Sequence, residues 1–413
     1  MFHFVYARGA AIKKIARGVL VFTLSRRSSG MFKTFTWILS CPIWALQLFT
    51  GAKSFRDNPL IGSRALNERG LHVLRQAMAH RATAWRRRRL GRGVPAPLAA
   101  AFARDGFVVV PDFLPAEAFS QLLDDVTRYR GPARETIQGD TVTRRIALDP
   151  RVLAGMPGMR RLLDRRLLGK LTRLAGGRDC EPLYYIQTIL PHAVTGDPDP
   201  QLQLHADTFH PTVKAWFTLT DVAEDSSPFI YVPGSHIITP ARRAWEKRMS
   251  IEASGSENRL TGRGSFRVDE DTISAMGYPP PRSFPLPANT LIVADTGGFH
   301  ARGAARDAGM RVEVWAYERG NPFCAPPVDL WRIPALGRWR VPVMWAFGDW
   351  LEESGLGRQV WRRRGTVGAF DRDVAGHAAA KVRQDMSGWP GRVSAGLVRK
   401  GLLFLKKKKQ KDF

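Results

Sequence analysis

The feature that most constrains this chain is a His-x-Asp motif, His205-Ala206-Asp207, followed much later by His300. Two histidines and one aspartate can occupy one face of an octahedral metal ion and leave the opposite face open, as in non-haem Fe(II) oxygenases. Residues two apart in a β-strand point the same way, so His205 and Asp207 can reach one ion together. The apolar run Thr290–Asp295, bounded by proline and glycine, predicts a second strand that ends near His300. We therefore expect β-sheets that bring these two segments together.

Several short apolar runs, separated by glycine and proline, predict further strands. Short strands separated by glycine and proline are typical of jelly rolls. We expect a mainly β core with the double-stranded β-helix (jelly-roll, cupin-like) fold, with flanking helices and basic helical extensions at both ends. The predicted strands are Phe107–Val110, Tyr184–Leu190, Lys214–Thr220, Phe229–Val232, Leu291–Ala294 and Arg311–Tyr317, and helices are expected at Leu71–Trp85, Pro115–Tyr129 and Ala241–Met249.

Composition divides the chain into three predicted regions. Residues 1–95 form a basic, amphipathic, helical N-terminal segment. Residues 96–325 form the catalytic jelly-roll domain, with an insertion at about residues 237–289 that has the length of a lid or substrate wall. Residues 326–413 form a basic extension rich in tryptophan and arginine, which closes with a lysine tail.

An ordered set of motifs accompanies the metal triad: Phe102–Pro111, Leu204–Asp207, Lys214–Asp221, Tyr231–His236, Ala294-Asp295 ahead of His300, and Arg311. These motifs resemble those of the phytanoyl-CoA dioxygenase (PhyH-like) family of Fe(II)/2-oxoglutarate-dependent oxygenases. They span about residues 100–325 in the family's order, and the ordered set is far more specific than the His-x-Asp motif alone. The resemblance implies a jelly roll that binds Fe(II) and uses 2-oxoglutarate and O2 as cosubstrates.

When each residue is matched to the family's motifs, the resemblance implies that His205, Asp207 and His300 are the iron ligands. It makes Arg311 the partner of the distal carboxylate of 2-oxoglutarate. An arginine suits that role because its planar fork binds a carboxylate through two parallel hydrogen bonds.

Other polar residues near the motifs have alternative roles. Arg302 and Arg306 compete for the same carboxylate, and Arg302 stands where family members often carry a serine. Gln187, in a core-like strand, either contacts the cosubstrate or is satisfied by backbone groups. His210 is expected beside the metal ligands or at the surface rather than on the ion, and His236 is expected to shape its turn.

These assignments predict a dioxygenase that hydroxylates a small-molecule or lipid-like substrate while 2-oxoglutarate is decarboxylated to succinate. Asp207 argues against the related halogenases, in which a small residue replaces the carboxylate. The alternative is a catalytically silent jelly roll that serves as a membrane- or glycan-binding platform, and the intact ligand set weighs against it.

The net charge of +26 favours an anionic substrate or partner. It is concentrated in Arg81–Arg92, which contains Arg86–Arg89, and in the tail Lys406–Lys411. No nucleic-acid-binding motif accompanies it, so nucleic acid is the weaker candidate partner, and solvated faces account for part of the excess. The three scattered cysteines form no disulfide or metal pattern, so a reducing, cytoplasmic location is expected; they are Cys41, Cys180 and Cys324.

The apolar segment 35–49 is shorter than the roughly 20 residues that span a bilayer, and Pro42 interrupts it. Its tryptophans and basic flanks predict a helix in an anionic membrane surface, which would place the enzyme peripherally on the inner face of the membrane. The tail segment 397–405 repeats this pattern. Packing of segment 35–49 on the core is an equal alternative, and the substrate and the oligomeric state are left open.

Overall fold

The computed structural model describes residues 40–324 and 329–374. The chain divides into two compact units, residues 1–372 and 373–413, and almost all described residues belong to the first. The tail segment 397–405 and the lysine tail lie outside the described residues, as does the beginning of segment 35–49. The three-region division stays a prediction. Among the described residues, no helix is long and apolar enough to cross a membrane.

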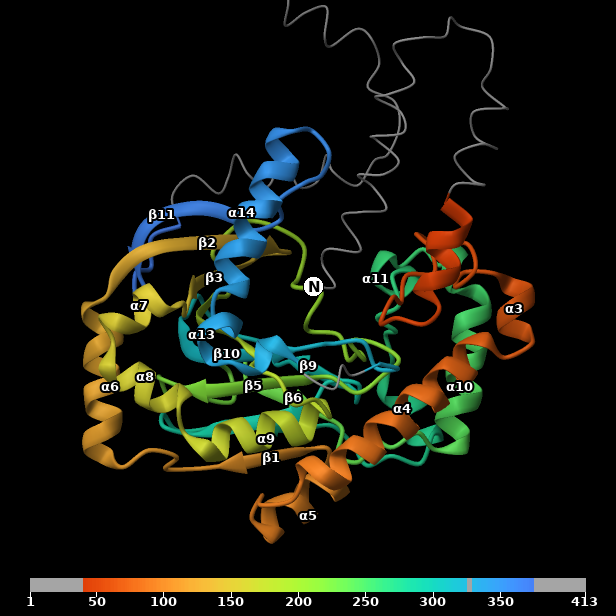
Figure 1. Cartoon of the computed structure of the whole chain (residues 1–413), viewed down its shortest axis with the longest axis horizontal. Helices are drawn as coiled ribbons and strands as arrows, with labels where there is room; N and C mark the ends of the chain where they lie inside the picture. Colours follow the sequence, from red (N-terminus) through yellow and green to blue (C-terminus); the bar gives the residue numbers. More distant parts are fainter. Residues whose placement is uncertain (1–39, 325–328, 375–413) are drawn as a thin grey trace, which may run out of the picture. The chain divides into compact units, whose positions relative to one another are not determined.

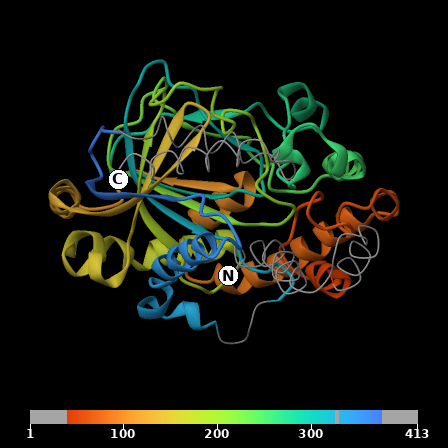
Figure 2. The same cartoon turned by 90° about the horizontal axis from the view of Figure 1, so that it is seen from above.

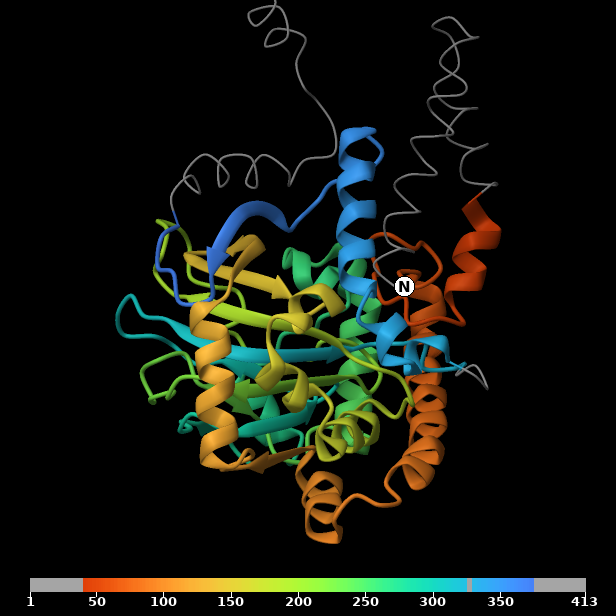
Figure 3. The ribbon, with the colours of Figure 1, turned by 60° about the vertical axis from the view of Figure 1, so that its left-hand side comes forward.

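Two antiparallel sheets form the core (Figure 1). The larger has eight strands, in the order β1 (Phe107–Val110), β8 (Leu291–Asp295), β5 (Val213–Thr218), β10 (Arg311–Glu318), β4 (Leu183–Leu190), β3 (Thr141–Ala147), β2 (Arg130–Gln138) and β11 (Arg362–Gly368). The smaller has the order β7 (Arg282–Phe284), β6 (Phe229–Tyr231) and β9 (His300–Arg302). Figure 3 shows the strands of the larger sheet one above another, from β11 to β1.

Between β4 and β10 the chain passes back and forth between the two sheets, as in a double-stranded β-helix. After β4 in the large sheet, His205 forms an antiparallel bridge with His300 of β9 in the small sheet. The chain then returns to the large sheet as β5, crosses to the small sheet as β6 and β7, and continues through β8, β9 and β10 in the same alternation. The jelly-roll core predicted from the sequence is confirmed.

The central strands β8, β5, β10 and β4 of the large sheet are buried on both faces, which explains their largely apolar sequences. In β10, Val312 and Val314 belong to an aliphatic cluster on the helix-covered face. Trp315, which follows Val314 in the strand, belongs to an aromatic cluster with Trp216 and Phe229. Because side chains alternate along a strand, the face toward the small sheet is aromatic. That face also carries the residues that line the central cavity.

Helices cover the aliphatic face and one side of the barrel (Figures 1 and 2). Their bounds are α3 (Arg64–Glu68), α4 (Leu71–Leu90), α5 (Ala96–Asp105), α6 (Ala116–Arg128), α7 (Pro150–Ala154), α8 (Pro157–Leu163), α9 (Arg166–Gly176), α10 (Pro240–Glu252), α11 (Arg259–Gly262), α12 (Glu270–Ala275), α13 (Pro334–Gly337) and α14 (Arg340–Glu353). In α9, Leu168, Leu171 and Ala175 form one apolar stripe that packs on β5 and β8. The N-terminal α4 packs on α10, where His72 lies 2.8 Å from Glu246 in a buried pair.

The strands predicted from apolar runs are all present, with ends that agree within two residues. The sequence pattern did not predict β7, β9 and β11, nor the neighbouring strands β2 and β3. Both are polar strands, and they bury charge as ion pairs such as Arg144–Glu135 at 2.7 Å. The apolar alternation that marks a strand is therefore absent from them.

Residues 40–47 are helical, and two sides of this segment differ. Trp44 is buried, and Asn58 donates a hydrogen bond to its carbonyl. Leu46 and Phe49 are 68% and 66% exposed. One side of the segment thus packs on the protein, while apolar side chains on another side face solvent.

Candidate active site

His205, Asp207 and His300 converge at one point inside the barrel. Asp207 Oδ1 lies 3.7 Å from Nε2 of His205 and 3.7 Å from Nε2 of His300. The three ligand atoms lie within 4.8 Å of one another, and no other such group occurs among the described residues. Backbone hydrogen bonds of 3.0 and 2.9 Å between His205 and His300 hold the two segments in register.

Each histidine is oriented by a bond on the far side of its ring. Nδ1 of His205 lies 2.8 Å from the Gln203 carbonyl, and Nδ1 of His300 lies 3.0 Å from the Gly298 carbonyl. Since a carbonyl only accepts, each Nδ1 carries the proton and each Nε2 presents a lone pair. Bonds of this kind fix the tautomer of metal-binding histidines. The donor set therefore fits Fe(II), with one face of the ion left for other ligands.

The ionisation states also suit metal binding, which requires neutral histidines and a charged carboxylate. Burial lowers the pKa of His205 well below its usual value and the pKa of His300 to about 4. Burial alone would raise the pKa of Asp207, but Lys214 and the two histidines hold it well below its usual value. All three side chains are therefore in their metal-binding form at neutral pH.

The turn after β6 holds the loop that carries His300. Ser235 Oγ accepts a hydrogen bond of 2.8 Å from the Phe299 amide. Tyr231 Oη donates a hydrogen bond of 2.8 Å to the Asp295 carbonyl. These two bonds tie both ends of the loop to the turn, so the turn sets where His300 enters the site.

Gly298→Ala should displace this loop and weaken iron binding. A Cβ at Gly298 would lie 2.0 Å from Tyr231 Oη, which is held by its own hydrogen bond, so the backbone must shift. Overpacking of this kind costs about 1–3 kcal/mol. We expect a lower urea midpoint and a lower Fe(II) affinity. Gly255→Ala is the matched control, since a Cβ there meets nothing within 4 Å; equal effects of the two substitutions would contradict this role.

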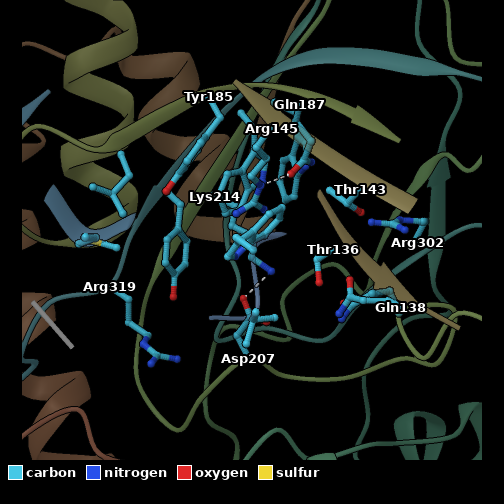
Figure 4. A pocket seen from close by; sticks show the side chains of 18 of the residues that line it. Thr136, Gln138, Thr143, Arg145, Tyr185, Gln187, Asp207, Lys214, Arg302 and Arg319 are labelled. Carbon is cyan, nitrogen blue, oxygen red and sulfur yellow. Dashed lines mark hydrogen bonds and ion pairs between the residues drawn. The ribbon is translucent and has the colours of Figure 1, made fainter. Parts of the chain in front are cut away.

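A cavity of about 480 Å³ opens onto the triad (Figure 4). Its walls come from inner faces of both sheets, from Lys53, and from residues 344–361 in and after α14. None of the residues that line it lies in the insertion at 237–289. The wall facing the site is therefore built by the C-terminal segment 344–361, not by the insertion as expected.

Asp349 fixes this C-terminal wall against the large sheet. It accepts hydrogen bonds of 2.7 and 2.5 Å from Arg134 of β2, and of 2.9 and 2.5 Å from Arg363 of β11. Trp345 and Phe347, which line the cavity, stand on the same helix. The buried pair with Arg134 and the more exposed pair with Arg363 thus hold an aromatic surface over the site.

Arg311 lines the cavity and is largely buried. Its guanidinium already has internal partners, because Nε lies 3.0 Å from Glu313 Oε2 and Nη1 donates to the Ser227 carbonyl. An incoming carboxylate would share the guanidinium with Glu313. Arg302 also lines the cavity but is paired with a buried aspartate. Arg306 is 77% exposed at its side chain and does not line the cavity.

Gln187 belongs to a polar ladder across three strands. Arg145 of β3, Gln187 of β4 and Glu313 of β10 stand opposite one another in register. Arg145 Nε donates to Gln187 Oε1 at 2.8 Å (Figure 4), and Gln187 Nε2 donates to Glu313 Oε1 at 2.7 Å. Side chains, and not backbone groups, therefore satisfy Gln187. Its contact with a cosubstrate stays a prediction.

Lys214 is a site residue that the sequence reasoning did not single out. Its Nζ lies 2.7 Å from Asp207 Oδ2 (Figure 4) and 3.4 Å from His300 Nε2. Like charges repel strongly at such distances, so this ammonium must turn away when a metal cation binds. The signal was available in β5, where Lys214 shares the inner face with Trp216.

Two further histidines lie near the motifs without joining the triad. His210 is buried, and its Nδ1 lies 2.9 Å from the Pro211 carbonyl. His236 packs against Phe102, with ring centroids 5.9 Å apart, and its ring lies where a Cβ on Gly106 would be. His210 is therefore buried and not at the surface, and the roles expected of the two residues stay predictions.

A jelly roll with two histidines and one aspartate converging inside it belongs to the class of non-haem iron proteins. Residues 102–261 match the family model described as phytanoyl-CoA dioxygenase (PhyH). The resemblance predicted from the motifs is confirmed over this range. The family match and the triad together indicate an oxygenase-type enzyme that depends on iron and 2-oxoglutarate. No curated protein gives a significant match.

Three solved structures illustrate the similarity. The non-haem α-ketoglutarate-dependent epimerase SnoN from nogalamycin biosynthesis shares 22% identity over 55% of this chain and 81% of its own, with a TM-score of 0.34. HygX from Streptomyces hygroscopicus, with nickel and 2-oxoglutarate bound, shares 16% identity over 55% and 87%, with a TM-score of 0.35. The carbocyclase SnoK from nogalamycin biosynthesis shares 18% identity over 55% and 84%, with a TM-score of 0.34.

Proposed function

We propose that this protein is an Fe(II)- and 2-oxoglutarate-dependent dioxygenase that hydroxylates a small anionic molecule. The observation that carries the proposal is the convergence of two unprotonated Nε2 atoms and Asp207 Oδ1 on one centre. His205, Asp207 and His300 would hold the iron, and Arg311 would hold the distal carboxylate of 2-oxoglutarate. The bound iron supplies the oxidising chemistry, in which O2, 2-oxoglutarate and a C–H bond give succinate, CO2 and an alcohol.

The protein's own residues would prepare this reaction by orienting groups and excluding water. The Arg311 fork orients the cosubstrate through parallel hydrogen bonds. The Phe229 ring, 6.2 Å from the His300 ring and 4.4 Å from the Trp216 ring, shields the triad with apolar surface. Lys214, once turned away from Asp207, can hold an anionic group near the centre.

The size and lining of the cavity favour a small-molecule substrate. Its volume of about 480 Å³ lies within the range of small-molecule sites, roughly 300–1,000 Å³. To test the proposed reaction, the protein would be incubated with Fe(II), 2-oxoglutarate, ¹⁸O2 and a small-molecule extract. The expected result is a product other than succinate that contains one ¹⁸O atom and that depends on Fe(II), 2-oxoglutarate and the extract. A product formed equally by Asp207→Ala would contradict the assignment of the site.

One observation favours the alternative, a catalytically silent jelly roll. Glu313 pairs with Arg311 and Lys214 pairs with Asp207, so both functional groups already have internal partners. If the protein is silent, it will neither bind Fe(II) tightly nor consume 2-oxoglutarate. If it is the proposed enzyme, Fe(II) will displace Lys214, and 2-oxoglutarate will be consumed.

We also propose contact with an anionic membrane surface, supported by the exposed apolar side chains of Leu46 and Phe49. Each well-placed basic residue adds about 1 kcal/mol, weakened by salt. The protein should co-sediment with anionic vesicles and be partly released at high salt. Replacing Leu46 and Phe49 by serine, or Lys406–Lys409 by glutamine, should reduce binding, while buried Trp44 is left intact. Equal binding to neutral vesicles, or none to anionic ones, would rule the contact out.

A further inference from the structure

Arg145 differs from the other arginines on the inner strands of the cavity because, among the described residues, no carboxylate pairs with it. The other two arginines of the inner strands are paired, Arg302 with Asp199 and Arg311 with Glu313. Among the described residues, Arg145 has one hydrogen-bond partner, the neutral amide of Gln187, and no acidic group within ion-pair distance. Its guanidinium therefore keeps a full positive charge and two terminal nitrogens without a partner in the part of the chain that the structure describes.

Three aromatic rings fix the plane of this guanidinium. Its carbon lies 3.9 Å from the centroid of Trp315, 4.3 Å from that of Trp361 and 4.8 Å from that of Tyr185. Rings at these distances attract the cation through their faces. They also restrict its rotation, because bulky neighbours lie against it. The edge of the fork, with Nη1 and Nη2, is then the part of Arg145 that can receive a ligand in the cavity.

The charge of the whole cavity favours an anion there. Among the described residues, seven lysines and arginines line it, whereas Asp207 is the one carboxylate in the lining, and Glu313 and Asp199 pair with Arg311 and Arg302. The charges of Fe(II) and of the 2-oxoglutarate dianion cancel, so the excess of positive charge persists after both bind. Burial lowers the pKa of Lys53 to about 7, which reduces the excess without removing it.

The position of Arg145 separates it from the proposed cosubstrate anchor. Along the ladder, Gln187 and Glu313 stand between Arg145 and Arg311. Trp361, which covers one side of Arg145, belongs to the C-terminal wall. Arg145 thus lies where the inner sheet meets that wall, next to the aromatic surface that includes Trp345.

We propose that Arg145 is the anchor for the substrate: it binds a carboxylate or phosphate group on a planar, apolar molecule that lies against the aromatic wall. This inference rests on the proposed function, since it assigns Arg311 to 2-oxoglutarate. Carboxylate and phosphate share the chemistry that a guanidinium fork recognises, two adjacent anionic oxygens. The aromatic rings would bind the planar body.

Three matched probes test the proposal: 2-naphthoate, 2-naphthyl phosphate and the uncharged 2-naphthamide. Each is titrated by calorimetry, without oxygen, into protein that holds Fe(II) and saturating 2-oxoglutarate. At least one of the two anions should bind 10-fold or more tightly than the amide, and the better anion identifies the group. Hydrogen bonds between a guanidinium and an anionic group typically change Kd by about 10- to 100-fold. Equal affinity for all three probes would overturn the proposal.

Arg145→Met should lower the affinity for the better anion by about 10- to 100-fold, to that of the amide. Arg145→Lys, which keeps the charge without the fork, should give an intermediate affinity and guards against a folding defect in the first variant. Arg151→Met is the matched control, because Arg151 also lies over a tryptophan, Trp339 at 4.8 Å, but is exposed and does not line the cavity. Unchanged anion affinity in Arg145→Met would overturn the proposal.

The 2-oxoglutarate affinity of the same variants separates the two proposals. It should fall less in Arg145→Met than in Arg311→Lys. A larger fall in Arg145→Met would place Arg145 in the cosubstrate site and reject the substrate anchor while leaving the proposed function intact. Failure of the wild-type protein to bind 2-oxoglutarate at all would instead reject the proposed function.

Discussion

His300→Ala should abolish tight Fe(II) binding while the jelly roll stays folded. His300 would supply one of only three protein ligands, and its Nε2 is the sole donor that β9 contributes to the triad. Loss of a residue that hydrogen-bonds to a metal ligand lowers metal affinity by about 10- to 100-fold. Loss of the ligand itself should therefore lower the Fe(II) affinity by more than about 100-fold. Iron content after dialysis and a competitive Fe(II) titration would measure the effect, and circular dichroism would report the fold.

His192→Ala is the matched control for this experiment. His192 is also hydrogen-bonded, to Asp140 at 2.7 Å, but its side chain is 45% exposed and it does not line the cavity. Its replacement should leave the Fe(II) affinity unchanged. If His300→Ala binds iron as tightly as this control does, His300 is not a ligand, and the three-residue site is wrong.

Arg311→Lys should weaken 2-oxoglutarate binding by about 10- to 100-fold with Fe(II) still bound. Lysine keeps the charge but loses the bidentate fork, and charge-assisted hydrogen bonds to a carboxylate contribute about 1.5–3 kcal/mol. The charge-transfer absorption of the Fe(II)–2-oxoglutarate complex, titrated without oxygen, would measure the affinity.

Arg306→Ala controls for the loss of a positive charge near the site, because Arg306 is exposed and lies outside the cavity. It should have no effect on the cosubstrate. Arg302→Ala addresses the other alternative. If Arg302→Ala weakens 2-oxoglutarate binding and Arg311→Lys does not, the carboxylate anchor has been assigned to the wrong arginine.

The parts of the site that follow from local periodicity could be predicted from the sequence. His205 and Asp207 come together as expected from their spacing, although their segment forms an isolated bridge at His205 and not a strand, and the apolar run of β8 leads directly to the segment that carries His300. Arg311 could be placed on the inner face by alternation along β10. Each of these inferences needed only one strand and the residues next to it.

The parts of the site that could not be predicted from the sequence depend on pairing between distant segments. The ladder Arg145–Gln187–Glu313 exists only through the register of three strands, which no single strand encodes. From the sequence, the numerous arginines of the C-terminal segment predict an exposed basic surface. In the fold, Arg340 lies 3.1 Å from Glu318, and Asp349 joins two further arginines to the same helix. Buried ion pairs therefore conceal both β2 and the C-terminal wall from a search for apolar patterns, and they account for part of the positive charge.

Conversion of 2-oxoglutarate to succinate tests the central claim most directly. Purified protein would be supplied with ¹⁴C-labelled 2-oxoglutarate and O2, with and without Fe(II), and released ¹⁴CO2 and succinate would be counted. We predict Fe(II)-dependent release that is lost in His205→Ala, Asp207→Ala and His300→Ala and persists in His192→Ala. No release by the iron-loaded wild-type protein, either alone or with a small-molecule extract, would contradict the assignment as a 2-oxoglutarate-dependent oxygenase.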